Sequence, residues 1–228
     1  MSVKTGAQLD SSIQFINFNH PYYAGEPLTI FSCIMQKILI LFAHPAMHKS
    51  RINRALIQTA KSIRGVEVND LYENYPDFFI DVKREQKLLQ EHHIIIWHHP
   101  FYWYSAPALL KEWIDLVLEH NFAYGKSGTN LHGKWVMNCI TTGGNSDVYS
   151  EEGRNHYTIN QFLIPFHQTA LLCGMHYLPP FVVHDTHNLN DSEIDRFARM
   201  YQQALTSLRD NKLKPEQLFS ATQLNEIL

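Results

Sequence analysis

The apolar run from Ile38 to Ala43 restricts the possible fold more than any other stretch of the chain. It has the length of a strand and no polar alternation, so it predicts a parallel strand buried on both faces, at the centre of a sheet. After His44 and Pro45, a short polar connection leads to Ser50. There a segment begins whose apolar residues have the spacing of an amphipathic helix: Ile52, Leu56, Ile57 and Ile63.

The turn between this strand and this helix predicts an anion site. A helix N-terminus presents unpaired N–H groups and a partial positive charge, so a phosphate can lie there while Ser50 caps the helix or donates to the phosphate. The turn contains neither the glycine-rich fingerprint of dinucleotide-binding proteins nor that of the P-loop. Hydroxyl, amide and imidazole groups must therefore provide the contacts.

Strands and helices alternate along the rest of the chain. Further strands are predicted at 66–71, 93–97, 134–140 and 176–183, the last one broken by two prolines and peripheral. Helices are predicted at 82–92, at 107–120, from about 157 towards 173, and from about 191 to 208. This alternation predicts an α/β fold: a flavodoxin-like, doubly wound, five-stranded parallel sheet with helices on both faces.

The predicted domain covers residues 35–210. Residues 1–34 have scattered aromatic and polar residues without a sustained period, and they are predicted to form an irregular N-terminal extension. Residues 211–228 are predicted to be a C-terminal tail that docks weakly or against a partner. With 228 residues and 45% hydrophobic content, the chain is long enough for one well-buried domain with extensions.

Charge and cysteine content narrow the classes of function. Nineteen basic and 22 acidic residues give a net charge of -3 without a basic run, which argues against a nucleic-acid partner and favours a small molecule or a protein. Cys33, Cys139 and Cys173 form no CxxC pair, which argues against a disulfide framework or zinc site. Without an apolar run long enough to span a bilayer or the pattern of a signal peptide, a cytoplasmic location is expected.

Three segments follow the predicted strands and should meet at the carboxyl edge of the sheet: 44–53, 100–105 and 141–144. The aromatic residues 101–104 could simply pack at a strand end, but four consecutive rings cannot all face inward. The sequence Thr-Thr-Gly-Gly could be an ordinary turn, but paired glycines also let backbone N–H groups approach the edge of a ring. A phosphate cap, an aromatic wall and an amide edge together indicate a flavin mononucleotide site.

Other kinds of site have less support. The histidines at positions 44, 48, 92, 93, 98 and 99 suggest metal ligands, but adjacent histidines on a strand point to opposite faces and no acidic or cysteine residue joins them at a ligand spacing. No metal is therefore expected. A serine hydrolase is disfavoured because the chain contains no G-x-S-x-G motif.

Several ordered motifs between about residues 37 and 209 are shared with a known group of proteins. They are AHP followed by S-x-x-N, LYENYPDFFID, the block from HP-aromatic-WYS to LLK-x-WID, FAYG, LHGK and TTGG. With them the chain resembles the flavodoxin-like NAD(P)H:quinone oxidoreductases, and within these the ancillary flavoproteins of glutathione-gated potassium efflux systems. The resemblance implies FMN, with FAD as the alternative. The flavin-binding residues it implies are His44, Ser50, Arg51, Ile52, Asn53, Phe101, Tyr102, Trp103, Tyr104, Thr141, Thr142, Gly143 and Gly144.

The resemblance also implies a pair of residues that stabilise charge on the flavin. Tyr149 matches the tyrosine of that pair. The histidine falls on Asn155 when positions are counted forward from TTGG and on His156 when they are counted back from Pro165; we favour His156.

The implied reaction is a two-electron hydride transfer from NAD(P)H through the flavin to a quinone or another electrophile. The implied assembly is a homodimer with the active site at the subunit interface. The alternative function is regulatory: a subunit that activates a potassium efflux transporter at its cytoplasmic domain, peripheral to the inner membrane through that protein partner, with reductase activity secondary.

Overall fold

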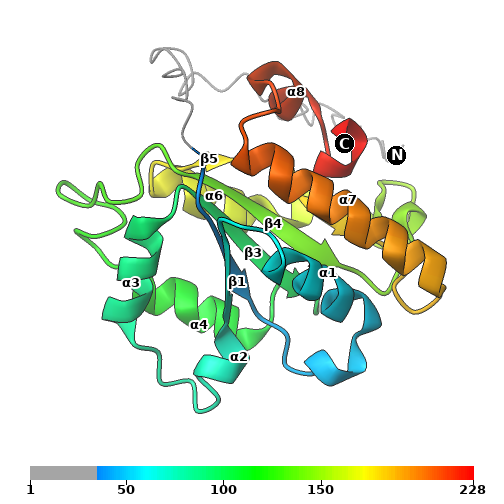
Figure 1. The fold of residues 1–228 in the computed structure, drawn as a ribbon, viewed down its shortest axis with the longest axis horizontal. Helices are drawn as coiled ribbons and strands as arrows, with labels where there is room; N and C mark the ends of the chain where they lie inside the picture. The colour runs from blue at the N-terminus through cyan, green and yellow to red at the C-terminus, as the bar shows by residue number, and fades with distance from the viewer. Residues whose placement is uncertain (1–34) are drawn as a thin grey trace, which may run out of the picture. The chain divides into compact units, whose positions relative to one another are not determined.

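The computed structural model describes residues 35–228; the predicted extension at 1–34 lies outside the described residues. A parallel sheet forms the centre of the fold (Figure 1). Its strands run in the order β2-β1-β3-β4-β5, which confirms the predicted flavodoxin-like order. Along the chain, the first four strands are β1 (Ile38–Phe42), β2 (Val66–Asp70), β3 (Ile94–Pro100) and β4 (Trp135–Thr141).

The fifth position of the sheet is occupied by two short strands. β5 (His176–Tyr177) and β6 (Phe181–Val183) both pair with β4 in parallel, at opposite ends of it. Pro179 and Pro180 lie between them, and proline lacks the N–H that a continuous ladder needs. The predicted break at the two prolines is confirmed.

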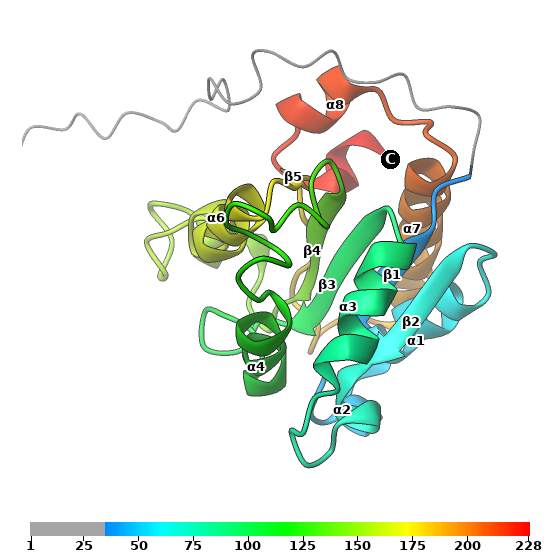
Figure 2. The ribbon, with the colours of Figure 1, turned by 90° about the vertical axis from the view of Figure 1, so that its left-hand side faces the viewer.

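Helices cover both faces of the sheet (Figure 2). α1 (Arg51–Lys61) and α7 (Asp191–Arg209) pack on one face against Ile38, Ile40 and Phe42. α3 (Val82–Glu91), α4 (Ala108–Val117) and α6 (Ile164–Leu172) pack on the other face, against Leu39 and Leu41. Successive residues of β1 thus enter opposite cores, as the alternation of side chains along a strand requires.

The helix predicted from 157 towards 173 is in fact two helices. α5 (Ile159–Phe162) begins at a capping box in which Thr158 and Gln161 satisfy each other's backbone N–H groups. α6 follows after Leu163, with Pro165 in its first turn. Proline has no N–H to continue the hydrogen bonds of a preceding helix, so a new helix starts there.

One charged side chain lies inside the core. Glu85 on α3 is fully buried, and its carboxylate accepts hydrogen bonds from Asn69 Nδ2 at 2.6 Å, Tyr75 Oη at 2.6 Å and Trp113 Nε1 at 2.7 Å. Arg84 pairs with the same carboxylate from the surface. Burial and the bond to Glu85 raise the pKa of Tyr75 to about 12. The carboxylate ties α3, α4 and the end of β2 together.

The C-terminal segment, predicted to be a tail that docks weakly or against a partner, packs on the domain itself. It forms α8 (Pro215–Ser220) and a 3-10 helix, η4 (Leu224–Ile227), and the side chains of Leu218 and Leu224 are buried. The Asn225 amide accepts from the Val182 N–H at 2.8 Å and donates to the Val182 carbonyl at 3.0 Å. One asparagine side chain therefore satisfies the outer edge of β6.

Candidate flavin site

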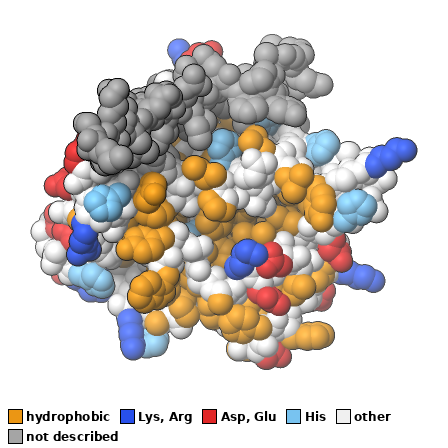
Figure 3. Space-filling model, turned by 180° about the vertical axis from the view of Figure 1, so that it is seen from behind, with side chains coloured by type: hydrophobic (Ala, Val, Ile, Leu, Met, Phe, Trp, Pro, Cys, Tyr) orange, Lys and Arg blue, Asp and Glu red, His pale blue; other side chains and the backbone are white. Residues whose placement is uncertain are grey.

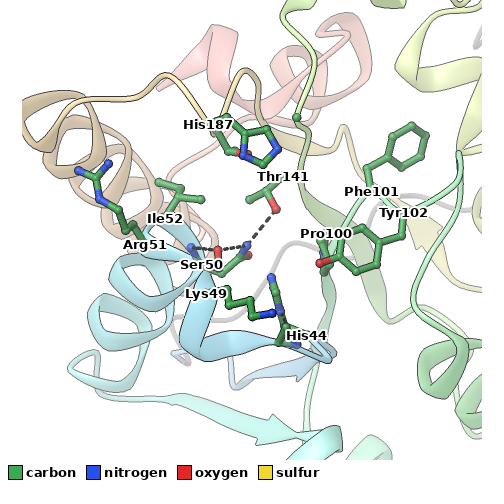
Figure 4. Close-up of a pocket in the computed structure, with 14 residues that line it drawn as sticks. His44, Lys49, Ser50, Arg51, Ile52, Pro100, Phe101, Tyr102, Thr141 and His187 are labelled. Atoms are coloured by element: carbon green, nitrogen blue, oxygen red, sulfur yellow. Dashed lines mark hydrogen bonds between the residues drawn. The ribbon is translucent and has the colours of Figure 1, made fainter.

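A cavity of about 490 Å³ opens at the carboxyl ends of β1, β3 and β4 (Figure 4). The sheet order reverses between β1 and β3, which is where α/β proteins of this type hold their ligands. The volume of the cavity is in the range typical of small-molecule sites. The lining residues are His44, Ala46, Lys49, Ser50, Arg51, Ile52, Asn53, Pro100, Phe101, Tyr102, Thr141, Gly143, Thr186 and His187.

Ser50 caps α1, as predicted. Its Oγ accepts from the Asn53 N–H at 3.2 Å and from Asn53 Nδ2 at 2.9 Å. Asn53 is a buried residue of the cavity wall, and its Nδ2 also donates to Thr141 Oγ1 at 3.0 Å. Asn53 thus links the start of α1 to the end of β4.

These bonds determine where the hydroxyl hydrogens can point. Ser50 Oγ already accepts two hydrogen bonds, and Thr141 Oγ1 accepts one. No residue within 35–228 accepts a hydrogen bond from either hydroxyl, so both are free to donate into the cavity. With the N-terminus of α1 and the Lys49 side chain, this wall of the cavity is suited to an anionic group.

Arg51 has another role in the structure. Its guanidinium donates to the Leu189 carbonyl at 3.1 Å and pairs with Asp191 at the start of α7. In Figure 4 the side chain points away from the cavity. Only the part of Arg51 nearest its backbone can therefore face a ligand, and the charge near the cavity comes from Lys49.

His44 is buried at the end of β1. Its Nδ1 accepts from the Ala46 N–H at 3.1 Å, and burial lowers the pKa of the imidazole. Its ring meets that of Tyr102 edge to face at 6.1 Å between centroids. A neutral histidine here contributes shape and a hydrogen bond to the cavity wall instead of a full charge.

The aromatic segment after β3 forms a tight turn. Phe101 is buried, whereas the exposed fractions of Tyr102, Trp103 and Tyr104 are 41%, 92% and 51%. The prediction that some of these rings are exposed is confirmed. Trp103 and Tyr104 have φ values of 49° and 62°, which bulky residues rarely adopt. Tyr102 pairs with Ser105 across the turn. Such strain is often kept at functional sites.

More large apolar side chains are exposed elsewhere on the surface. Leu116 on α4 and Ile164 and Leu172 on α6 belong to this group. Figure 3 shows many hydrophobic side chains exposed on the face seen from behind Figure 1.

The Thr142–Gly144 turn is stabilised by hydrogen bonds to the Gly144 carbonyl. Gly144 O accepts from Thr142 Oγ1 at 2.7 Å and from the Asp185 N–H at 3.0 Å. Within the described part of the chain, nothing accepts from the N–H of Gly143 or Gly144. A Cβ on Gly143 would lie 3.0 Å from His187 Nε2, and one on Gly144 would lie 2.8 Å from Val148 Cγ2. The N–H groups of Gly143 and Gly144 are therefore free to donate to a ligand. A side chain at either position would crowd its neighbours.

Of the residues predicted to stabilise charge, Tyr149 lies beside Gly144, and none of Tyr149, Asn155 and His156 lines the cavity. The Tyr149 ring packs against Phe101 at 5.9 Å and His184 at 5.6 Å, and burial raises the pKa of its phenol. His156 is exposed, with φ of 59°. Asn155 Oδ1 accepts a long hydrogen bond of 3.4 Å from the Tyr104 hydroxyl.

Sequence reasoning missed several lining residues. Lys49 lies within the segment 44–53, but no local pattern distinguishes it from a surface lysine. Thr186 and His187 follow β6, and the Thr186 N–H donates to the Thr142 carbonyl at 3.0 Å. The signal that identifies this loop is its place at the carboxyl end of the fifth strand, where ligands of such sheets lie.

Two further features bear on the classes of function considered. None of the helices in residues 35–228 is both long enough and apolar enough to cross a membrane. Over the same residues, histidine, cysteine and acidic side chains form no group of three that could hold a metal ion. His98 and His99 point to opposite faces of β3: His98 bonds to Asn53 and His99 to Asn138.

Residues 36–206 match the model of a family described as having a flavodoxin-like fold, and the chain belongs to this family. The ancillary protein KefG of the glutathione-regulated potassium-efflux system from Pectobacterium atrosepticum is 47% identical over 171 residues, which cover 75% of this chain and 93% of that protein. The predicted resemblance to the ancillary proteins of these systems is confirmed.

Solved structures extend the likeness to a protein in complex with FMN and to a quinone reductase. General stress protein 14 from Treponema denticola, in complex with FMN, has 35% identity and a TM-score of 0.73, and the match covers 75% of this chain and 99% of that one. An NADPH-quinone reductase from P. pentosaceus has 32% identity and a TM-score of 0.69, with coverage of 75% and 98%. The predicted resemblance to quinone reductases is confirmed as well.

Proposed function

We propose that this protein binds FMN in the cavity described above and acts as an ancillary protein of a glutathione-regulated potassium-efflux system. The observation that carries the proposal is the meeting of anion donors and the free N–H group of Gly143 around one cavity. The Ser50 and Thr141 hydroxyls, Lys49 and the start of α1 suit a phosphate. The identity to KefG supports the ancillary role.

The residues fit a flavin by their chemistry. The N–H groups of Gly143 and Gly144, which have no acceptor within the described residues, would donate to the carbonyl and nitrogen edge of the ring. Tyr102 lines the cavity, and together with Trp103 and Tyr104 it would cover the ring. When bound, the flavin supplies a centre that accepts and donates hydride. The protein orients the ring, tunes it by hydrogen bonds and excludes competing reactions.

A second candidate function is an NAD(P)H:quinone oxidoreductase. The likeness to an NADPH-quinone reductase supports it, and so do the exposed aromatic side chains beside the cavity, which suit a flat substrate. In this function Tyr149 and His156 would donate hydrogen bonds to the reduced ring, and a second copy of the chain would complete the cleft. The two functions are compatible, because an ancillary protein can also reduce quinones.

The first experiment identifies the cofactor. Purified protein is expected to be yellow, with about one flavin per chain, and the mass of the released cofactor distinguishes FMN from FAD. Protein that remains colourless after reconstitution with either flavin would overturn the proposal.

The second experiment separates the two functions. An ancillary protein should co-purify with its efflux transporter and change glutathione-controlled potassium efflux in cells. A reductase should oxidise NAD(P)H in the presence of quinones. A flavin-loaded protein that reduces quinones but neither binds the transporter nor changes efflux would leave only the second function.

A further inference from the structure

A buried chain of hydrogen bonds ends at the hydroxyls that line the cavity. It starts on α7, where the Tyr201 hydroxyl lies 3.3 Å from His98 Nδ1. On β3, His98 Nε2 lies 3.0 Å from Asn53 Oδ1, and Asn53 Nδ2 donates to Ser50 Oγ and Thr141 Oγ1. Tyr201 and His98 are fully buried, and Asn53 is 1% exposed.

The direction of each bond follows from the atoms. Asn53 Oδ1 can only accept, so His98 Nε2 carries the hydrogen. Burial lowers the pKa of His98 to about 3, so the ring is neutral near pH 7 and Nδ1 accepts from the Tyr201 hydroxyl. The amide of Asn53 then has only its Nδ2 hydrogens to present to Ser50 and Thr141.

A ligand with negative charge needs this direction. If the Asn53 amide were turned over, its oxygen would accept from the Ser50 and Thr141 hydroxyls, and neither could donate into the cavity. The Nε2–H of His98 disfavours that arrangement, because it would then face the Asn53 NH₂ group, donor against donor. The imidazole thus holds two hydroxyls ready to donate, although it does not reach the cavity itself.

We propose that His98 is a positioning residue for the phosphate of the cofactor, acting through Asn53 on the Ser50 and Thr141 hydroxyls. The inference rests on the proposed function, because it assumes that a flavin phosphate occupies this end of the cavity. It adds a requirement within the core of the protein: position 98 must provide a hydrogen-bond donor where Nε2 now lies.

The test compares FMN with riboflavin, which lacks the phosphate, by fluorescence titration of the apoprotein. His98→Leu removes the donor, and FMN affinity is expected to fall about tenfold while riboflavin affinity changes little; tenfold is what loss of one well-directed hydrogen bond typically causes. His98→Gln places an amide N–H near the position of Nε2 and should keep FMN affinity within about threefold of wild type. Tyr201→Phe leaves the Nε2 donor in place and should preserve the ratio of the two affinities.

A second variant tests the link independently of the packing of His98. Asn53→Ala should reduce the FMN-to-riboflavin affinity ratio as His98→Leu does, and the double variant should be no worse than Asn53→Ala alone, because both act through one path. Thermal unfolding of each variant measures the fold separately.

The outcomes are distinguishable. Equal losses of FMN and riboflavin affinity in His98→Leu, without rescue by His98→Gln, would reduce His98 to a packing residue and overturn the inference. Additive losses in the double variant would also overturn it. A wild-type protein that binds neither ligand would overturn the proposed function itself, and the inference with it.

Discussion

Ser50 combines two roles that a pair of substitutions can separate. Its Oγ caps α1 by accepting from Asn53, and its hydrogen is free to donate to an anion in the cavity. Ser50→Ala removes both. Loss of the cap is expected to lower the free energy of unfolding by about 1 kcal/mol. In a domain of this size that corresponds to a decrease of roughly 2–4 °C in Tm.

The effect of Ser50→Ala on FMN binding comes from the lost donor. One charge-assisted hydrogen bond among several contributes about 1.5 kcal/mol, so affinity should fall roughly tenfold. Lys49 and the N–H groups of α1 remain, which is why binding is weakened and not lost. Ser50→Thr keeps the hydroxyl and is the matched control for both measurements.

Ser50→Asp separates the roles. Aspartate is a good N-cap and its charge favours the N-terminus of a helix, so Tm should match or exceed that of wild type. The same carboxylate would face the phosphate and repel it, so FMN binding should be abolished. Calorimetry gives the stability and flavin fluorescence gives the affinity. A Ser50→Asp protein that binds FMN as wild type does would refute the placement of the phosphate at this helix.

Three other predictions concern the ring edge, the reduction step and pH. Gly143→Val should block flavin uptake, because a branched side chain would stand where the ring edge must approach the backbone N–H groups. Apoprotein titration checks this, and wild-type affinity would remove the ring-edge assignment. His156→Ala should slow flavin reduction by NAD(P)H in stopped-flow measurements at unchanged flavin content, with little effect of Asn155→Ala; the reverse result would favour Asn155. Burial lowers the pKa values of His98 and His99 from 6.5 to about 3 and about 4. Below pH 6.5 the unfolded chain therefore binds more protons than the folded chain. The contribution of these two histidines to the free energy of unfolding should be constant above pH 6.5 and fall towards pH 3 to 4. Denaturant titrations should find a smaller dependence of this free energy on pH in His98→Gln.

Local sequence patterns predicted the parts of the structure that depend on local physics. The unbroken apolar run at 38–43 required burial on both faces, and that burial placed β1 in the middle of the sheet. Ser50 could be recognised as a cap because its position relative to the apolar residues of the helix decides it. The two prolines marked the break in the last strand.

Other features depend on partners that are distant in the sequence. The resemblance implies a flavin contact for Arg51, yet its side chain pairs with Asp191, 140 positions away. Glu85 has the appearance of an exposed helix residue, and only the fold brings Trp113 and Tyr75 to its carboxylate. His98 likewise has no local pattern that separates it from a surface histidine.

The asparagine that covers β6 has a consequence for synthesis of the chain. Asn225 lies 43 positions after Val182, so during translation the last strand can join the sheet long before its outer edge is covered. An uncovered edge strand can pair with other chains, and the risk lasts until α8 and η4 have left the ribosome. Chains truncated before Asn225 should therefore aggregate more readily than chains that extend through Leu228, although both contain every residue that lines the cavity.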